Sequence, residues 1–135
     1  MSIPIKLVEA RQLFDAGEYE KALQLVSEID TKSKIHGAAF LLRADANYEL
    51  GNDIDALREY LSYVKHYPSG RAVDYCKFSA GICLKNLGLY EDAMYLFNMV
   101  QEITPSRHEE LEHTKMKIKK QSEAKSIFQS CMLSS

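Results

Sequence analysis

Bulky apolar residues recur along the chain at helical spacing, and each group of them follows a glycine. The three glycines, at positions 17, 51 and 88, lie in octapeptides of similar pattern: "AGEYEKAL", "LGNDIDAL" and "LGLYEDAM". Nine and twelve residues after each glycine stand large apolar or aromatic residues, a spacing that places both on one face of a helix. These residues are Val26 and Ile29, Tyr60 and Tyr63, and Phe97 and Val100. The pattern predicts three similar helical units, with periods of 34 and 37 residues.

Small residues flank each glycine at constant distances and indicate how a unit folds. Seven residues before the glycine and five after it stand Ala10 and Ala22, Ala44 and Ala56, and Gly81 and Ala93. A glycine just past a helix end readily adopts the left-handed conformation that reverses the chain. Small side chains on both sides of this turn let two antiparallel helices approach closely. Each unit is therefore predicted to be a helical hairpin, and such hairpins must stack to bury their apolar faces.

Prolines and polar residues mark the expected helix ends. Pro68 and Pro105 stand seventeen residues after the second and third glycines, where they stop a helix, whereas Lys34 holds that position in the first unit. The last segment, "RHEELEHTKMKIKKQSEAKSIFQ", is mostly polar, which suits a helix that caps the open end of a stack, with "SCMLSS" as a frayed end. We expect helices at about 3–16, 19–31, 37–50, 53–66, 74–87, 90–103 and 107–129.

This arrangement of small residues, glycine, tyrosine, alanine and proline resembles the tetratricopeptide repeat (TPR), a helical hairpin of 34 residues. The match extends from Ile3 to about Arg107. Asp53 departs from it, because the tyrosine usual at that position stands in the other two units, at Tyr19 and Tyr90. The resemblance implies an all-α fold, a single TPR domain over residues 1–135. It would be an α-solenoid of three TPR helical hairpins, with repeats at about 3–36, 37–70 and 74–107 and a C-terminal capping helix at 107–129.

The composition excludes several classes of function. The 135 residues are 46% apolar and 27% charged, as in one ordinary globular domain. The net charge of −2 offers no electrostatic surface for nucleic acid, and no apolar run is long enough for membrane insertion. The N-terminal residues lack the apolar stretch of a signal peptide, so a cytoplasmic location is expected. Cys76 and Cys83 are expected to be small buried thiols and not a disulfide, because a helix would hold them about 10 Å apart.

The sequence contains no recognised motif for catalysis or metal binding. It contains no phosphate-binding loop, no dinucleotide fingerprint and no nucleophile elbow. In "HEELEH", His108 and His113 are five residues apart and so diverge around a helix, whereas a zinc site needs both on one face. The lysines between positions 115 and 125 share their helix with glutamates and indicate a solvated face, with contact to an acidic partner or RNA as the alternative. We therefore expect no enzymatic activity, no metal and no cofactor.

In stacked TPR hairpins, the first helix of each unit lines a concave surface on which peptides bind. The resemblance places one charged and several apolar side chains of each unit on that surface. The candidate groove residues are Leu7, Arg11, Phe14, Leu41, Asp45, Tyr48, Tyr75, Phe78, Ile82 and Lys85. One branch of the family binds a C-terminal carboxylate through lysine, asparagine and arginine side chains of the groove. Among the matching positions here Arg11 alone is basic, so a carboxylate-clamp ligand is excluded.

This groove composition favours an extended apolar segment of a partner protein, with Tyr48, Tyr75 and Phe78 as anchors. The alternative is that these side chains pack into the core, as expected in part for Phe14 and Phe78. The stretch "AGICLKNLGLYEDAMYLF", residues 80–97, is also similar to the class II chaperones of bacterial type III secretion, which hold hydrophobic translocator subunits in the cytoplasm. That resemblance implies a chaperone, with an adaptor or scaffold subunit of a multiprotein complex as the alternative. The sequence leaves a homo-oligomer open.

Overall fold

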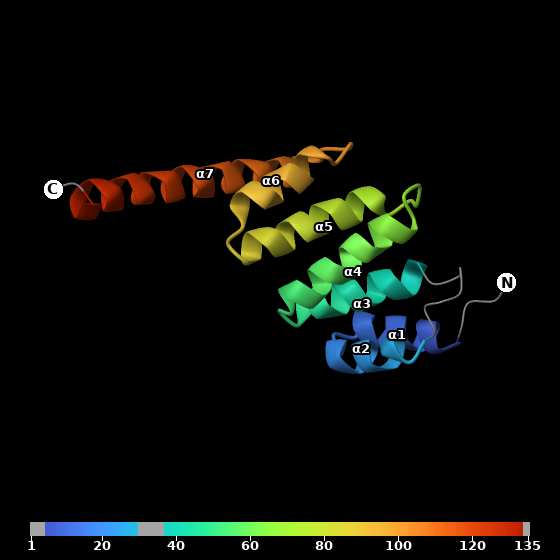
Figure 1. Ribbon diagram of the computed structural model, residues 1–135. Helices are drawn as coiled ribbons and strands as arrows, with labels where there is room; N and C mark the ends of the chain where they lie inside the picture. Colours follow the sequence, from blue (N-terminus) through green and yellow to red (C-terminus); the bar gives the residue numbers. More distant parts are fainter. Residues whose placement is uncertain (1–4, 30–36, 134–135) are drawn as a thin grey trace.

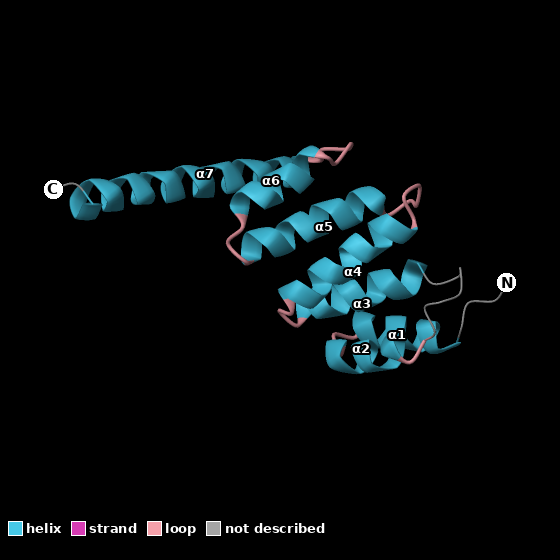
Figure 2. Cartoon of the chain, viewed as in Figure 1, coloured by secondary structure: helices cyan, strands magenta, loops and turns pink. Residues whose placement is uncertain are grey.

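Seven α-helices make up the described part of the chain, residues 5–29 and 37–133 of a computed structural model (Figures 1 and 2). They are α1 (Ile5–Asp15), α2 (Tyr19–Ser27), α3 (Gly37–Glu49), α4 (Asp53–His66), α5 (Val73–Asn86), α6 (Tyr90–Asn98) and α7 (Pro105–Phe128). A π-helical turn, Gln129–Leu133, continues α7. These residues contain no strand, so the predicted all-α fold is confirmed.

The helices pack in the order in which they follow one another along the chain. Each one contacts the next, from α1 against α2 to α6 against α7. Figure 1 shows them as a layered stack that runs from the N-terminal to the C-terminal part of the chain. α1 also contacts α3, which brings the first helices of the first two pairs side by side. Side chains of α1, α3 and α5 consequently meet on one face of the stack.

Each helix pair reverses at a glycine with a left-handed backbone. At the third turn, Gly88 has a φ of 81° and its N–H donates to the carbonyl of Lys85 at 2.9 Å, while the N–H of Leu89 donates to Leu84 at 2.9 Å. This pair of bonds satisfies carbonyls at the end of α5 that would otherwise lack a partner. The same two bonds recur at the first and second turns, where the glycine φ values are 80° and 79°. The predicted role of the three glycines is confirmed.

The repeated apolar positions of the sequence form the core. The small residues on both sides of each turn are buried, as are the bulky residues nine and twelve positions after each glycine. Gly81 lies so close to Phe97 on the next helix that a Cβ at this position would overlap the ring. Buried side chains form three successive clusters, shared by α1 to α3, by α3 to α5 and by α5 to α7. The core is therefore built between neighbouring helices along the whole stack.

Two helices end earlier than the sequence pattern predicts. α6 ends at Asn98 and not near residue 103. In the segment that follows, the backbone N–H groups of Gln101 and Glu102 donate to the carboxylate of Asp74 on α5 at 3.1–3.2 Å, which holds the chain off the helical path. α2 ends at Ser27 and not near residue 31. Residues 3–4, expected at the start of the first helix, and residues 30–36, with Lys34, lie outside the described residues.

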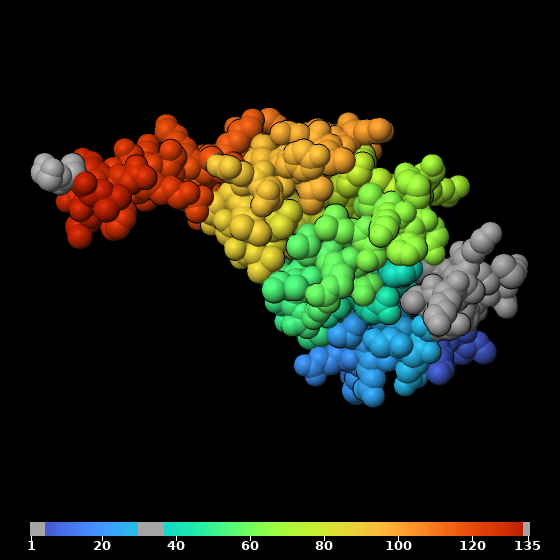
Figure 3. Space-filling view, viewed as in Figure 1, coloured from blue at the N-terminus to red at the C-terminus, as the bar shows by residue number. Residues whose placement is uncertain are grey.

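α7 covers the end of the stack with its first half only. Leu111 joins the buried cluster around Phe97, whereas every described side chain from Lys119 to Leu133 is exposed. Figures 1 and 3 show this second half projecting beyond the other helices. The helix expected at 107–129 thus covers the stack with its first turns alone, and the end expected to fray is helical up to Leu133. Within the described ranges, no helix is both long and apolar enough to cross a membrane.

Candidate functional site

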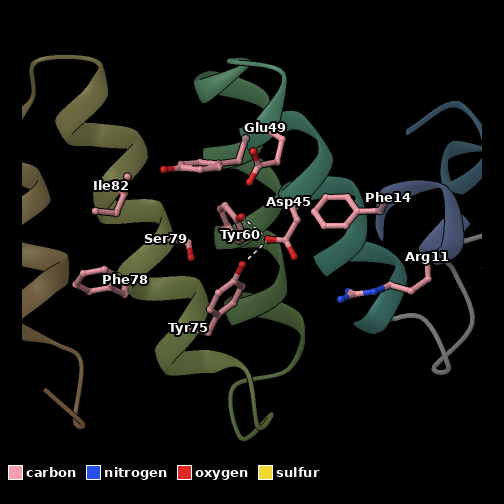
Figure 4. A pocket seen from close by; sticks show the side chains of 10 residues that line it. Arg11, Phe14, Asp45, Glu49, Tyr60, Tyr75, Phe78, Ser79 and Ile82 are labelled. Carbon is pink, nitrogen blue, oxygen red and sulfur yellow. Dashed lines mark hydrogen bonds between the residues drawn. The ribbon is translucent and has the colours of Figure 1, made fainter. Parts of the chain in front are cut away.

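A hollow of about 420 Å³ opens on the face where α1, α3 and α5 meet (Figure 4). We name it the central pocket. Seven of the ten side chains predicted for a groove line it, two from α1, two from α3 and three from α5: Arg11, Phe14, Asp45, Tyr48, Tyr75, Phe78 and Ile82. Three further residues complete the lining: Glu49, Tyr60 and Ser79. The helices that the repeat pattern assigns to one surface do contribute to a single hollow.

A second hollow of about 360 Å³, which we name the apolar pocket, lies between α1 and α3 and shares Arg11 with the central pocket. Two more of the predicted residues are here, Leu7 and Leu41. Leu7 is buried and belongs to its floor, whereas Leu41 is half-buried. The rest of the lining is Val8, Gln12, Ala38 and Leu42. We call the two adjoining pockets together the groove.

Lys85, the tenth predicted groove residue, lies apart from both pockets. Its Nζ forms an ion pair with Glu110 of α7 and lies 2.7 Å from Nδ1 of His113. These contacts tie α5 to the first half of α7 across 25 and 28 residues of sequence. Lys85 therefore fastens the terminal helix, a role that the spacing within its own repeat does not reveal.

Asp45 of the central pocket accepts two side-chain hydrogen bonds. Its Oδ1 accepts hydrogen bonds from the hydroxyls of Tyr60 at 2.5 Å and Tyr75 at 2.6 Å, both drawn in Figure 4. Burial raises the pKa of the Tyr60 hydroxyl, and the neighbouring Asp45 carboxylate raises it further. Burial, followed by the hydrogen bond to Asp45, raises the pKa of Tyr75 to about 12. Both hydroxyls therefore remain protonated donors, and they hold the carboxylate in one orientation.

The aromatic side chains of the central pocket differ in how far they pack into the core. Phe78 is half-buried and packs on Phe97 with ring centroids 4.8 Å apart, and Phe14 packs on Tyr19 at 5.1 Å. Tyr48 and Tyr75 are 36% and 43% exposed. Phe14 and Phe78 thus pack partly into the core, as the alternative interpretation of the sequence expects, while the two tyrosines present accessible rings to the groove.

Sequence reasoning missed three lining residues of the central pocket. Tyr60 is predicted as a core residue, and its ring is indeed buried, but its hydroxyl reaches the groove. Glu49 follows Asp45 by one helical turn and so lies on the same face of α3. The helical spacing of the sequence could therefore have predicted it. Ser79 is buried one position after Phe78, where its small side chain leaves the hollow open.

Neither a metal-binding cluster nor a reactive buried thiol occurs among the described residues. In the described ranges, no group of three His, Cys, Asp or Glu side chains is placed to hold a metal ion. Burial raises the pKa of the Cys76 and Cys83 thiols to about 12, so neither is a reactive thiolate near neutral pH. No protein-family model, curated protein or solved structure matches the chain. The groove is therefore the feature from which a function can be inferred.

Proposed function

We propose that this chain is an α-solenoid of three TPR-type hairpins that binds an extended apolar segment of a partner protein in its groove. The observation that carries the proposal is the convergence of side chains from α1, α3 and α5 on one hollow surface. In this interpretation the first helix of each hairpin contacts the ligand, and the second helix packs within the stack. No chemical step is assigned to the groove, and binding is its function.

The side chains of the groove suit an apolar segment. Tyr48 and Tyr75 are accessible, nearly rigid rings of the type that anchors many protein interfaces. The apolar pocket adds aliphatic surface, with Leu41 half-buried and Val8 45% exposed. A segment that crosses both pockets would bury this surface, and its own apolar side chains would leave water at the same time.

The narrower proposal is a cytoplasmic chaperone, as the similarity of residues 80–97 to the class II secretion chaperones implies. A translocator subunit carries segments that insert into membranes, and a groove that covers such a segment would prevent aggregation before export. An adaptor would use the same groove in a lasting complex. The two differ in the fate of the partner: a chaperone's client loses solubility without it and leaves on secretion, whereas an adaptor stays in a stoichiometric assembly.

Site-specific crosslinking in the native cells tests the groove directly. A photoreactive phenylalanine derivative is placed at Tyr48, at Tyr75, or at Tyr95 as a control, since Tyr95 is 69% exposed on α6 and lines neither pocket. Mass spectrometry of the crosslinked products identifies the partner and the segment. We expect both groove positions to capture the same apolar segment and the control to miss it. Equal capture at all three positions, or none at the groove, would refute the proposal.

Alanine variants measure how much the anchors contribute. Tyr75→Ala should weaken binding of the captured partner by on the order of 2 kcal/mol, provided that circular dichroism shows an intact fold. Phe78→Ala removes a ring that also packs on Phe97, so a loss of stability should accompany its loss of binding. A Tyr75→Ala protein that folds and binds with unchanged affinity would remove Tyr75 from the binding surface. Depletion of the chain then separates the chaperone, whose client becomes insoluble, from the adaptor.

A further inference from the structure

The charges that line the central pocket do not balance. Two carboxylates face it from α3, Asp45 and Glu49, one helical turn apart. Arg11 is the one basic side chain among the lining residues, and its Nε already forms an ion pair with Asp15 at 3.2 Å. Glu49 forms no ion pair within the described part of the chain. The pocket therefore presents excess negative charge to whatever enters it.

Asp45 is positioned to receive a cation. The two tyrosine hydroxyls bind its Oδ1, and Oδ2 accepts no hydrogen bond from the described side chains. Figure 4 shows the carboxylate between the α1 and α5 sides of the pocket, with both hydroxyls on one of its oxygens. The two bonds fix the geometry before any ligand arrives, so little ordering remains to be done on binding. A positively charged donor would find an oriented, half-buried acceptor, which is the setting in which charge-assisted hydrogen bonds are strongest.

Aromatic rings surround these carboxylates. Phe14 approaches from α1 and Tyr75 from α5 (Figure 4). Tyr48 of α3 also lines the pocket. A cation within about 6 Å of such a ring centroid is attracted by the negative face of the ring. Arg11 already makes this contact inside the chain, with its guanidinium carbon 5.5 Å from the centre of the Phe14 ring. The same walls would cover the aliphatic part of a lysine or arginine side chain while its charged end reaches the carboxylates.

We propose that the central pocket is a subsite for a lysine or arginine side chain of the bound segment. This inference rests on the proposed function and specifies its ligand: a basic residue in the central pocket, next to apolar residues in the apolar pocket. An acidic residue at that position would be repelled by Asp45 and Glu49. A purely apolar one would bury the two negative charges without a cation to compensate them, which disfavours it. The groove thus selects a segment that is apolar but carries one basic side chain at a defined place.

Peptide selection followed by a charge-exchange cycle tests the subsite. Dodecapeptides are selected from a random phage-displayed library on the full chain, synthesised, and assigned to the groove if Tyr48→Ala weakens their binding. Calorimetry then compares each peptide with a version in which its lysine or arginine is replaced by norleucine, which keeps the aliphatic chain and removes the charge. The protein variants are Asp45→Asn, which still accepts the tyrosine hydroxyls, and Glu49→Gln. Glu91→Gln, the same charge change at an exposed position of α6, is the matched control.

We expect a lysine or arginine in most groove-binding peptides and at least about a tenfold loss of affinity with norleucine. In Asp45→Asn the norleucine replacement should cost no more than about twofold, while Glu91→Gln behaves as the wild type. Groove-binding peptides without a preferred basic residue, or with a preference for acidic ones, would overturn the subsite and leave the proposed function standing. If norleucine replacement lowers the affinity equally for the wild type, Asp45→Asn and Glu49→Gln, the subsite is likewise overturned and the proposed function stands. A library that yields no groove-binding peptide would overturn the proposed function as well.

Discussion

Replacing Gly81 by alanine tests how closely α5 and α6 pack, and hence the framework that positions the α5 side of the groove. A Cβ at Gly81 would lie 2.7 Å from Cδ1 of Phe97 and closer still to Cε1. Both distances are far below van der Waals contact. The Phe97 ring is fully buried and packs on Phe78, with centroids 4.8 Å apart, so its neighbours restrict its movement. The helices must separate or the Phe97 ring must shift.

Two effects of opposite sign determine the free energy of unfolding of Gly81→Ala. Alanine in place of glycine within a helix stabilises by about 1 kcal/mol. Overpacking a tight core costs about 1–3 kcal/mol, and a clash with a confined ring belongs at the upper end. We therefore expect a net loss of about 2 kcal/mol.

Urea unfolding followed by far-ultraviolet circular dichroism measures this loss. Phe97→Leu provides the control, because a smaller side chain removes the overlap. In that background Gly81→Ala should be neutral or stabilising, since only the helix propensity remains. A Gly81→Ala protein as stable as the wild type would refute the close packing of α5 on α6. An identical loss in both backgrounds would show that Phe97 is not its cause.

Two further properties follow from burial. Cys76 and Cys83 have pKa values near 12 in the fold against a usual 9, and Tyr75 near 12 against 10. As the pH rises, the unfolded chain therefore loses these protons before the folded protein does. The free energy of unfolding should fall between about pH 9 and pH 12, which a lower urea midpoint would show. An unchanged urea midpoint would contradict the burial of these groups. Removing residues 119–135 should change the free energy of unfolding by no more than about 0.5 kcal/mol, because the described side chains there are exposed. A large loss in thermal unfolding would show that this half of α7 packs on the stack.

The projecting half of α7 is not uniformly polar. Its exposed apolar side chains include Ile127, 64% exposed, and Phe128, 58% exposed. The sequence pattern predicts a polar helix here and therefore a simple cap. The first turns of α7 do cover the stack, since Leu111 is buried there. The described side chains from Lys119 onward are exposed, and two of them, Gln121 and Lys125, share a hollow with the start of α6.

The helices and turns could be predicted from the sequence because their causes are local. A glycine after a helix, such as Gly88, is identified by its own neighbours, and its left-handed φ follows from the absence of a side chain. The repeated spacing also predicted which residues are buried, since Ala93 and Phe97 are buried like their counterparts in the earlier units. The early end of α6 was missed because Asp74, which binds the chain after it, lies 27 residues away.

The groove likewise combines features that the local sequence determines with features that only the tertiary structure determines. Periodicity alone brought Arg11, Asp45 and Tyr75 to one surface, because each stands on the same face of the first helix in its unit. The tertiary structure decided which of these side chains are partners. It joined Tyr60 and Tyr75 to one oxygen of Asp45, and it withdrew Lys85 from the groove to bind α7. A repeat pattern specifies a face, whereas a hydrogen bond or ion pair depends on distances between helices, and stacking alone sets those distances.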